Sequence, residues 1–146
     1  MITYSFDGFY YNDFLVKGDR TITRSFGTSS YQTAVHPINV MDMNMTFTNA
    51  NGVYTRVGTR TRECVEGYTT AIWTDNVYVI TGNWTTTFPN AKVHTNAISN
   101  TSPIRIKLNC DYRVVSGVVN ITRPVSYTHL RAHETGRNLV CRLLLE

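Results

Sequence analysis

Residues 41–61 read MDMNMTFTNANGVYTRVGTRT, and this stretch decides the fold. Apolar and polar residues alternate strictly through its first half, up to Thr48. A period of two is typical of a β-strand, whose successive side chains point to opposite faces of a sheet. Asn51-Gly52 then favours a hairpin turn, because these residue types tolerate the positive φ that tight turns need. We therefore expect two long antiparallel strands joined at Asn51-Gly52.

The returning strand of this hairpin carries arginines on one face. Arg56, Arg60 and Arg62 share that face with Tyr54, while valines and threonines occupy the other. We expect these arginines to form a solvated ladder. The side chains expected to face inward are Met43, Met45, Phe47, Ile106, Leu108 and Cys110.

The same alternation returns near residue 104. IRIKLNC, residues 104–110, alternates so that Cys110 lies on the core face of its strand. The segment DYRVVSGVVNIT, residues 111–122, is apolar on both faces, as a central strand is. We expect one strand from each of these two segments.

Glycine recurs inside the strand-like segments VKGDRTIT, VGTRTR, ITGNWTTT and VSGVVNIT. A mid-strand glycine marks a bulge, a bend or a close approach of two backbones. Thr, Val, Ile, Tyr and Asn are abundant, which is the composition of pleated sheet rather than of helix. The fold class expected is all-β, an antiparallel meander of long hairpins that forms a curled sheet or a sandwich. The recurrent glycines are Gly18, Gly58, Gly82 and Gly117.

The C-terminal segment, residues 125–146, reads VSYTHLRAHETGRNLVCRLLLE. It resembles, codon by codon and in one frame, the translation of adapter DNA from transposase-based sequencing libraries. That resemblance implies a tail outside any natural domain, although its pattern favours a helix. We therefore expect a single, truncated β domain over residues 1–124, with the tail contributing nothing to its fold.

Composition narrows the classes of partner. The chain has 14 Lys and Arg against 10 Asp and Glu, and the tail holds three of these arginines and two of the glutamates. The remaining surplus of three positive charges is scattered along the chain, unlike the dense basic patch of nucleic-acid-binding proteins. We expect no nucleic-acid partner. Neither a signal peptide nor an apolar run of the roughly 20 residues that span a bilayer is found, so no transmembrane segment is expected.

Residues suited to catalysis or metal binding are few and isolated in the sequence. Glu63 and Glu66 read as exposed charges in a turn between hairpins, without a second carboxylate placed opposite them. His36 and His94 stand alone, as surface or strand-end histidines do, and the spacing of histidines and cysteines does not suit a metal. We expect no enzyme activity, no catalytic residues, no metal and no cofactor. Outside the tail the cysteines are Cys64 and Cys110, and the sequence leaves open whether they pair.

Aromatic residues are the most suggestive feature for function. Rings on a rigid sheet can stack against sugar rings, but cross-strand aromatic pairs that only stabilise a sheet look the same in sequence. An exposed coplanar row would indicate a carbohydrate-binding module, and rings packed between strands would indicate a structural role. The candidates for stacking against a glycan are Trp73, Tyr78 and Trp84.

The ordered segments FDGFYYND, VKGDRTIT, GTRTRECVEGY, WTDNVYVITGNWTTT and RIKLNCDYRVVSGVVNITRP resemble a group of uncharacterised β-rich exported proteins. Members are often lipoproteins of Bacteroidetes-type bacteria, and the resemblance covers about residues 6–124. It implies a secreted or cell-envelope location and a β architecture, without a specific activity. We expect a non-catalytic envelope or secreted β module, structural or adhesive, whose partner is a glycan or another envelope protein. The alternative is a carbohydrate-binding module that uses exposed Tyr and Trp.

Overall fold

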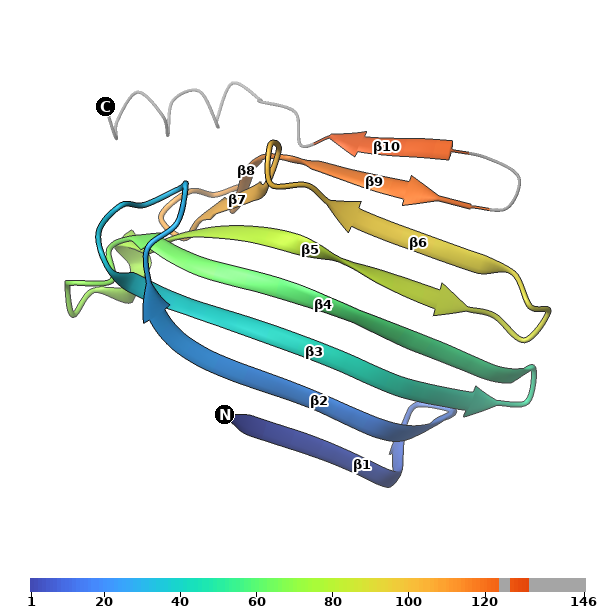
Figure 1. Cartoon of the computed structure of the whole chain (residues 1–146). Coiled ribbons are helices and arrows are strands. Elements are labelled where there is room, and N and C mark those ends of the chain that lie inside the picture. Colours follow the sequence, from blue (N-terminus) through green and yellow to red (C-terminus); the bar gives the residue numbers. More distant parts are fainter. Residues whose placement is uncertain (124–126, 132–146) are drawn as a thin grey trace.

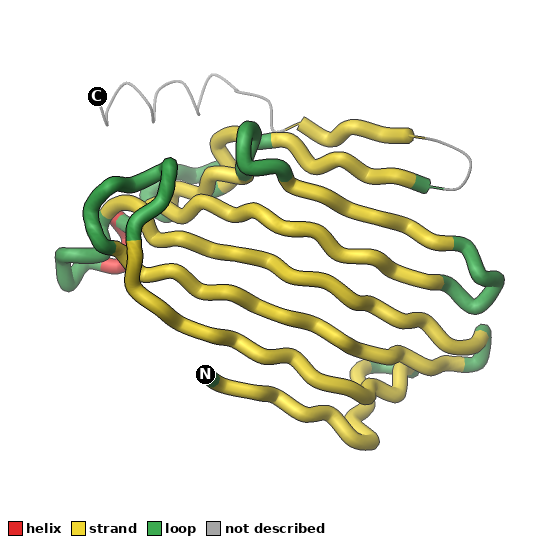
Figure 2. The backbone as a smooth tube through the Cα atoms, viewed as in Figure 1, coloured by secondary structure: helices red, strands yellow, loops and turns green. Residues whose placement is uncertain are grey.

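The computed structural model of the chain describes residues 1–123 and 127–131. Within them, ten strands form one antiparallel sheet, and the backbone is strand along most of its course (Figures 1 and 2). The all-β antiparallel prediction is thereby confirmed. The elements are β1 (Ile2–Tyr11), β2 (Phe14–Gly27), β3 (His36–Asn49), β4 (Gly52–Glu66), the 3-10 turn η1 (Trp73–Asp75), β5 (Val77–Thr87), β6 (Val93–Ile98), β7 (Ile104–Lys107), β8 (Val114–Ser116), β9 (Val118–Thr122) and β10 (Tyr127–Arg131).

The strands follow one another across the sheet in nearly the order of the chain. Strands β1 to β6 are successive neighbours, and β9 and β10 continue the path beyond β6. The first half of β5 also pairs with β7, which in turn pairs with β8. Because every described strand belongs to this one sheet and β1 does not pair with β10, the architecture is an open, curled sheet rather than a sandwich.

The hairpin between β3 and β4 fixes which residues share a face. Asn49 pairs with Gly52, so the two turn residues are Ala50 and Asn51, one position earlier than predicted. Gly52 has a φ of 126°, and the Asn51 backbone N–H donates to Asn49 Oδ1 at 2.9 Å. The hairpin itself is confirmed.

This register brings the methionines and the arginines to the same face. Met41 pairs with Arg60 and Met45 pairs with Arg56, and residues paired across strands lie on one face of a sheet. Arg60 is half-buried there, so the predicted ladder of solvated arginines is wrong at this position. We call this side of the sheet the arginine face, and the opposite side, where most of the strand threonines lie, the threonine face.

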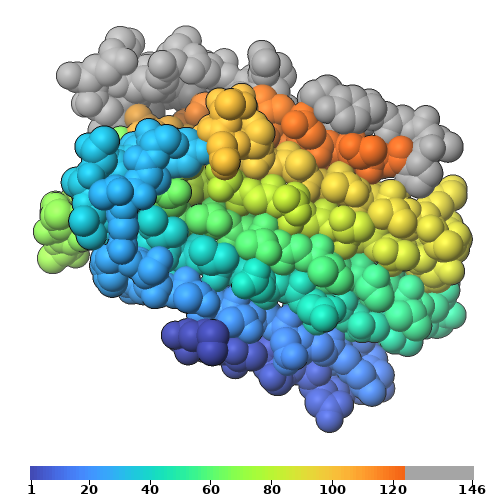
Figure 3. All heavy atoms as spheres, in the orientation of Figure 1, coloured from blue at the N-terminus to red at the C-terminus, as the bar shows by residue number. Residues whose placement is uncertain are grey.

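The fully buried core sits on the threonine face at one end of the sheet. Val65, Val77 and Val79 pack together there, and Tyr31 from the segment between β2 and β3 packs against them. In the space-filling view this light-blue segment stands on the face of the sheet nearest the viewer (Figure 3). On the arginine face, the residues predicted to face inward are half-buried, namely Met43, Met45 and Phe47.

Two predicted strands are shorter than expected. β7 ends at Lys107, and Leu108 and Cys110 lie in the following turn, where the Cys110 N–H donates to the Lys107 carbonyl at 3.4 Å. Cys110 is buried as predicted, but its placement in a strand is wrong, because turn-forming Asn109 and Asp111 flank it. Cys64 is a buried free thiol, so Cys64 and Cys110 do not pair with each other.

The predicted central strand over residues 111–122 is also wrong. It is divided at Gly117, whose φ of 125° separates β8 from β9. Gly82 has a φ of 131° inside β5, where an added Cβ would collide with the Thr59 carbonyl and approach Arg60 Cα within 2.8 Å. These positions confirm that the recurrent glycines mark bends and close backbone approach.

The adapter-like segment is described only at residues 127–131, whose backbone forms β10 beside β9. An exposed strand edge can pair with any extended backbone, since the hydrogen bonds involve no side chains. The helix favoured by the pattern of the tail lies outside the described residues. Within the described part of the chain, no helix is long and apolar enough to cross a membrane.

Candidate functional site

Two loops cover the same end of the sheet from opposite sides. Residues 28–35 link β2 to β3 on the threonine face, and residues 67–76 link β4 to β5 on the arginine face. The first loop encloses a filled core, whereas the second stands over a pocket. These two sites are the candidates for function.

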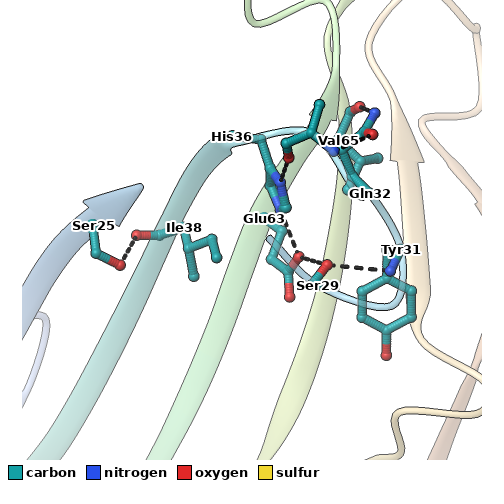
Figure 4. A network of polar contacts seen from close by, with 9 residues as sticks. Ser25, Ser29, Tyr31, Gln32, His36, Ile38, Glu63 and Val65 are labelled. Atoms are coloured by element: carbon teal, nitrogen blue, oxygen red, sulfur yellow. Dashed lines mark hydrogen bonds and ion pairs between the residues drawn. The ribbon is translucent and has the colours of Figure 1, made fainter. Parts of the chain in front are cut away.

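The loop on the threonine face is anchored by a buried ion pair (Figure 4). His36 is completely buried at the start of β3, and its Nε2 lies 2.8 Å from Glu63 Oε2. The other ring nitrogen, Nδ1, lies 2.8 Å from the Ala34 carbonyl. The two ring nitrogens therefore connect His36 to the backbone of the loop on one side and to β4 on the other. The predictions of a solitary His36 and an exposed Glu63 are therefore wrong.

Further hydrogen bonds tie the same loop to the sheet. Ser29 Oγ donates to Glu63 Oε2 at 2.5 Å, and Gln32 Nε2 donates to the Val65 carbonyl at 3.0 Å. The Tyr31 hydroxyl donates to the Asn100 carbonyl at 2.6 Å. Burial of Tyr31, together with the charge of Glu63, raises the pKa of its phenol.

Serine, histidine and glutamate meet here, but their connections do not form a catalytic triad. In a triad the serine hydroxyl contacts the histidine that removes its proton. Here Ser29 contacts Glu63 instead, and the imidazole of His36 is inaccessible. This cluster can hold the loop in place but cannot activate a nucleophile.

A pocket of about 270 Å³ lies on the arginine face beneath residues 67–76. Its floor is built from side chains of four strands, β2 to β5, and its wall from the loop. The lining residues are Arg24, Pro37, Asn39, Arg62, Cys64, Gly67, Tyr68, Thr70, Ala71, Trp73, Asn76 and Tyr78.

The loop over the pocket is shaped by local polar contacts. Gly67 has a φ of 78°, and a Cβ there would lie 2.6 Å from Asp75 Oδ1, so glycine is required. Thr70 Oγ1 donates to Asp75 Oδ2 at 2.8 Å, and Asn76 Nδ2 donates to the Tyr78 hydroxyl at 3.1 Å. Asp75 Oδ1 and Asn76 Oδ1 are buried without a hydrogen-bond partner. The loop is ordered by polar contacts while its apolar side chains stay exposed.

A second hollow of about 190 Å³ adjoins this pocket along the arginine face. Asn39 and Arg62 line both hollows, which are therefore neighbours, and we call the two together the groove. The second hollow is lined by Arg20, Ile22, Asn39, Met41, Arg60, Arg62 and Ile80.

The structure separates the three aromatic residues predicted to stack against a glycan. Trp73 is 64 % exposed in η1 and lines the pocket together with Tyr78. The Arg62 guanidinium covers the Tyr78 ring at 4.9 Å from its centre. Trp84 lies six residues further along β5, about 20 Å away, and Arg60 covers its ring at 4.8 Å. Of these three rings only Trp73 is largely exposed, since Tyr78 and Trp84 are half-buried and each has an arginine over its ring.

Charge is divided between the two faces of the sheet. The strand pairing places the carboxylates of β1 to β4 on the threonine face, and the arginines of β2 and β4 on the arginine face. The positive charge is scattered along the sequence, as described, but strand pairing gathers five of the arginines on one face of the sheet. The carboxylates are those of Asp7, Asp19, Asp42, Glu63 and Glu66, and the arginines are Arg20, Arg24, Arg56, Arg60 and Arg62.

The pKa of Arg60 reflects its burial and the positive charges of the arginines beside it. Burial lowers the pKa of its guanidinium below the usual value, and the charges of Arg20 and Arg56 lower it further. Arginine still remains charged in proteins, so the direction of the shift reports unfavourable burial and repulsion of positive charge. Arg60 Nε is also buried without a hydrogen-bond partner.

In the described part of the chain, two further candidate residues, His94 and Glu66, lie apart from one another. His94, in β6, packs its ring against Phe88 with 4.4 Å between ring centres. Glu66 is exposed, as predicted, and pairs with Arg105 on β7. Among the described residues, no group of three His, Cys, Asp or Glu side chains could hold a metal ion.

No protein-family model matches this chain, and no curated protein or solved structure shows significant similarity to it. Functional inference therefore depends on the geometry of the two loops and the groove.

Proposed function

We propose that this protein is a non-catalytic, adhesive β module of the cell envelope or the secreted fraction, which binds a saccharide in the pocket beneath residues 67–76. The observation that carries this proposal is Trp73, whose indole is largely exposed at the pocket. An indole offers the C–H face of a sugar a large contact area at low entropic cost. The amides of Asn39 and Asn76 lie in the same lining and are suited to sugar hydroxyls.

The chemistry of the lining supports binding without turnover. Among the described residues that line the pocket, none is a carboxylate or a histidine that could act as a general acid or base. Cys64 contributes a thiol to this lining, and burial raises the pKa of that thiol. An activated cysteine has a lowered pKa, so Cys64 is suited to packing rather than to catalysis.

The envelope or secreted location is supported by the resemblance of the strand motifs to β-rich exported proteins. Fractionation of cells that express the full-length gene tests it. We expect the protein in the envelope or the medium, and its recovery with cytosolic proteins would contradict the proposal.

A second candidate is a purely structural envelope module without a ligand. It is favoured by the arginine caps on Tyr78 and Trp84, since those rings already have partners. The two candidates differ in the role they give to Trp73, which is a contact residue in the first and a surface residue without a role in the second.

Replacement of Trp73 distinguishes them. Screening on a glycan array followed by titration calorimetry should identify a saccharide whose affinity falls by about 1–3 kcal/mol in Trp73→Ala. The matched control is Ile72→Ala, which removes a neighbouring exposed side chain of the same loop and should leave affinity unchanged. Absence of any saccharide binding by the folded wild-type protein would leave the structural module as the better account.

A further inference from the structure

The groove on the arginine face is lined by four arginines and, among the described residues, by no carboxylate. Arg24 and Arg62 line the pocket beneath residues 67–76, and Arg20 and Arg60 line the adjoining hollow. Building on the proposed saccharide binding, we infer that the ligand is an acidic saccharide. Its carboxylate or sulfate groups are bound by Arg24 and Arg62 in the pocket and by Arg60 in the hollow.

The inference follows first from unbalanced charge. In the described ion pairs, carboxylates pair with His36 and Arg105 and not with an arginine of the groove. Asp75, in the loop over the pocket, is held by Thr70 and does not line the pocket. A guanidinium recognises carboxylate and sulfate oxygens with paired hydrogen bonds. The sheet places its own carboxylates on the opposite face. An anionic ligand would therefore supply the negative charge that the groove arginines lack.

The spacing of the arginines suits a chain of acidic units. Arg60 and Arg62 are two residues apart on the same face of β4, which corresponds to about 7 Å along the strand. Arg62 lines both hollows, so one ligand can contact both of them in succession. Exposed Trp73 then offers its ring to the apolar side of a sugar unit in the first pocket.

A single-stranded nucleic acid is the main competing anion, and the ring arrangement disfavours it. Such ligands stack successive bases on open aromatic faces. Here Arg62 covers Tyr78, and among the described aromatic residues that line the groove only Trp73 is largely exposed. One largely exposed ring in the groove, with several guanidinium and amide groups, fits an acidic sugar better than a run of bases.

Calorimetric titration with three trisaccharides tests the inference. The probes are trigalacturonate, a sulfated galactotriose and neutral galactotriose, each titrated into the full chain at low and at high salt. We expect at least one acidic probe to bind about tenfold or more tightly than the neutral one, and added salt to weaken only the acidic probes.

Variants locate the effect. Arg24→Gln should reduce the affinity for the acidic probe by about tenfold and the affinity for the neutral probe by much less. Arg62→Lys, which keeps the charge but removes the paired hydrogen bonds, should cause a smaller loss. The matched control is Lys17→Gln, which removes an exposed positive charge from the threonine face and should change nothing.

The outcomes separate this inference from the proposed function. Equal binding of neutral and acidic probes, sensitive to Trp73→Ala but not to Arg24→Gln, overturns the acidic ligand and retains saccharide binding. Failure of all three trisaccharides overturns the inference, and tight, Arg24-dependent binding of oligothymidylate in their place assigns the groove to nucleic acid and overturns both proposals.

Discussion

The loops 28–35 and 67–76 lie at the same end of one sheet, yet the first covers a packed core and the second covers a pocket. The first buries His36 and Glu63 and packs Tyr31 against three valines. The second leaves Trp73 exposed and stands over a pocket of about 270 Å³. A loop that fills the space beneath it stabilises the fold, whereas one that leaves space can accept a ligand.

Hydrogen bonding shows the same contrast. His36 and Glu63 have partners for their buried side-chain polar atoms, whereas Asp75 and Asn76 each leave a buried oxygen unpaired. Unpaired buried polar atoms are uncommon in folded proteins, and each one lowers the stability of the segment that holds it. The comparison supports a stabilising role for the first loop and the proposed ligand binding at the second.

The largest effect is expected from Glu63→Ala. It leaves His36 buried without its ionic partner and removes the acceptor of Ser29, and breaking a buried pair in this way costs about 3–5 kcal/mol. Urea denaturation measures the loss. The control is Glu66→Ala, which breaks an exposed ion pair with Arg105 and should cost less than about 1 kcal/mol. Equal losses in the two variants would remove the distinction between a buried anchor and a surface pair.

The next largest effect compares one aromatic residue from each loop. Tyr31→Ala removes a ring from the valine core and a hydrogen bond to Asn100, which should cost about 2 kcal/mol. Trp73→Ala removes an exposed ring and should change stability by no more than about 0.5 kcal/mol. Thermal melting of both variants gives the answer, and a larger loss in Trp73→Ala than in Tyr31→Ala contradicts the assignment of roles.

The sequence predicts where the strands of this fold lie better than it predicts which residues pair between them. Strict alternation over residues 41–48 and the turn at residues 50–52 are local signals, and both appear in β3, β4 and their hairpin. The partner of each arginine depends on register: a turn at Asn51-Gly52 would pair Arg56 with Phe47, whereas the observed turn pairs it with Met45. Because this shift moves each partner by two residues, the face on which the arginines lie does not change. A two-residue turn at Ala50 and Asn51 already implies that Met45 faces the same side as Arg56.

The candidate sites were harder to predict, because their residues are far apart in the chain. Trp73 and Tyr78 were expected from their residue types, but Arg24 and Arg62 meet them only through the pairing of β2 to β5. His36 and Glu63 are 27 residues apart, and nothing in the local pattern links them. Pairings of this kind depend on the tertiary fold, and the alternation of residues carries no information about them.

A smaller effect concerns Cys64, which lies between the two sites. Its thiol is buried at the floor of the pocket, and burial raises its pKa from the usual 9.0, opposed by a hydrogen bond with Tyr78. Because the folded pKa is raised, this contribution to stability is complete below pH 9.0 and is lost as pH rises through the folded value. Denaturation of wild-type and Cys64→Ser between pH 7 and 10 should show a steeper decline in the wild type. Parallel pH profiles would contradict the shift.

The smallest effect is expected at the far edge of the sheet. Deleting residues 125–146 removes the backbone pairing of β10 with β9 but leaves both loops intact. If this tail is adapter-derived, its removal should change stability by no more than about 0.5 kcal/mol, measured by thermal melting. A substantially larger loss would show that the tail belongs to the folded domain.

The most direct measurement is the fluorescence of Trp73 during titration with an acidic trisaccharide. The chain has two tryptophans, so Trp84→Phe leaves Trp73 as the only indole reporter at the pocket. The assignment of roles predicts a saturable change in Trp73 emission with trigalacturonate or the sulfated trisaccharide. Variants of Glu63 and Tyr31 should show the same change as long as they remain folded, and lose it only when they unfold. An unchanged emission spectrum, under conditions where calorimetry detects binding of the same trisaccharide, would place the ligand elsewhere and contradict the assignment of binding to residues 67–76.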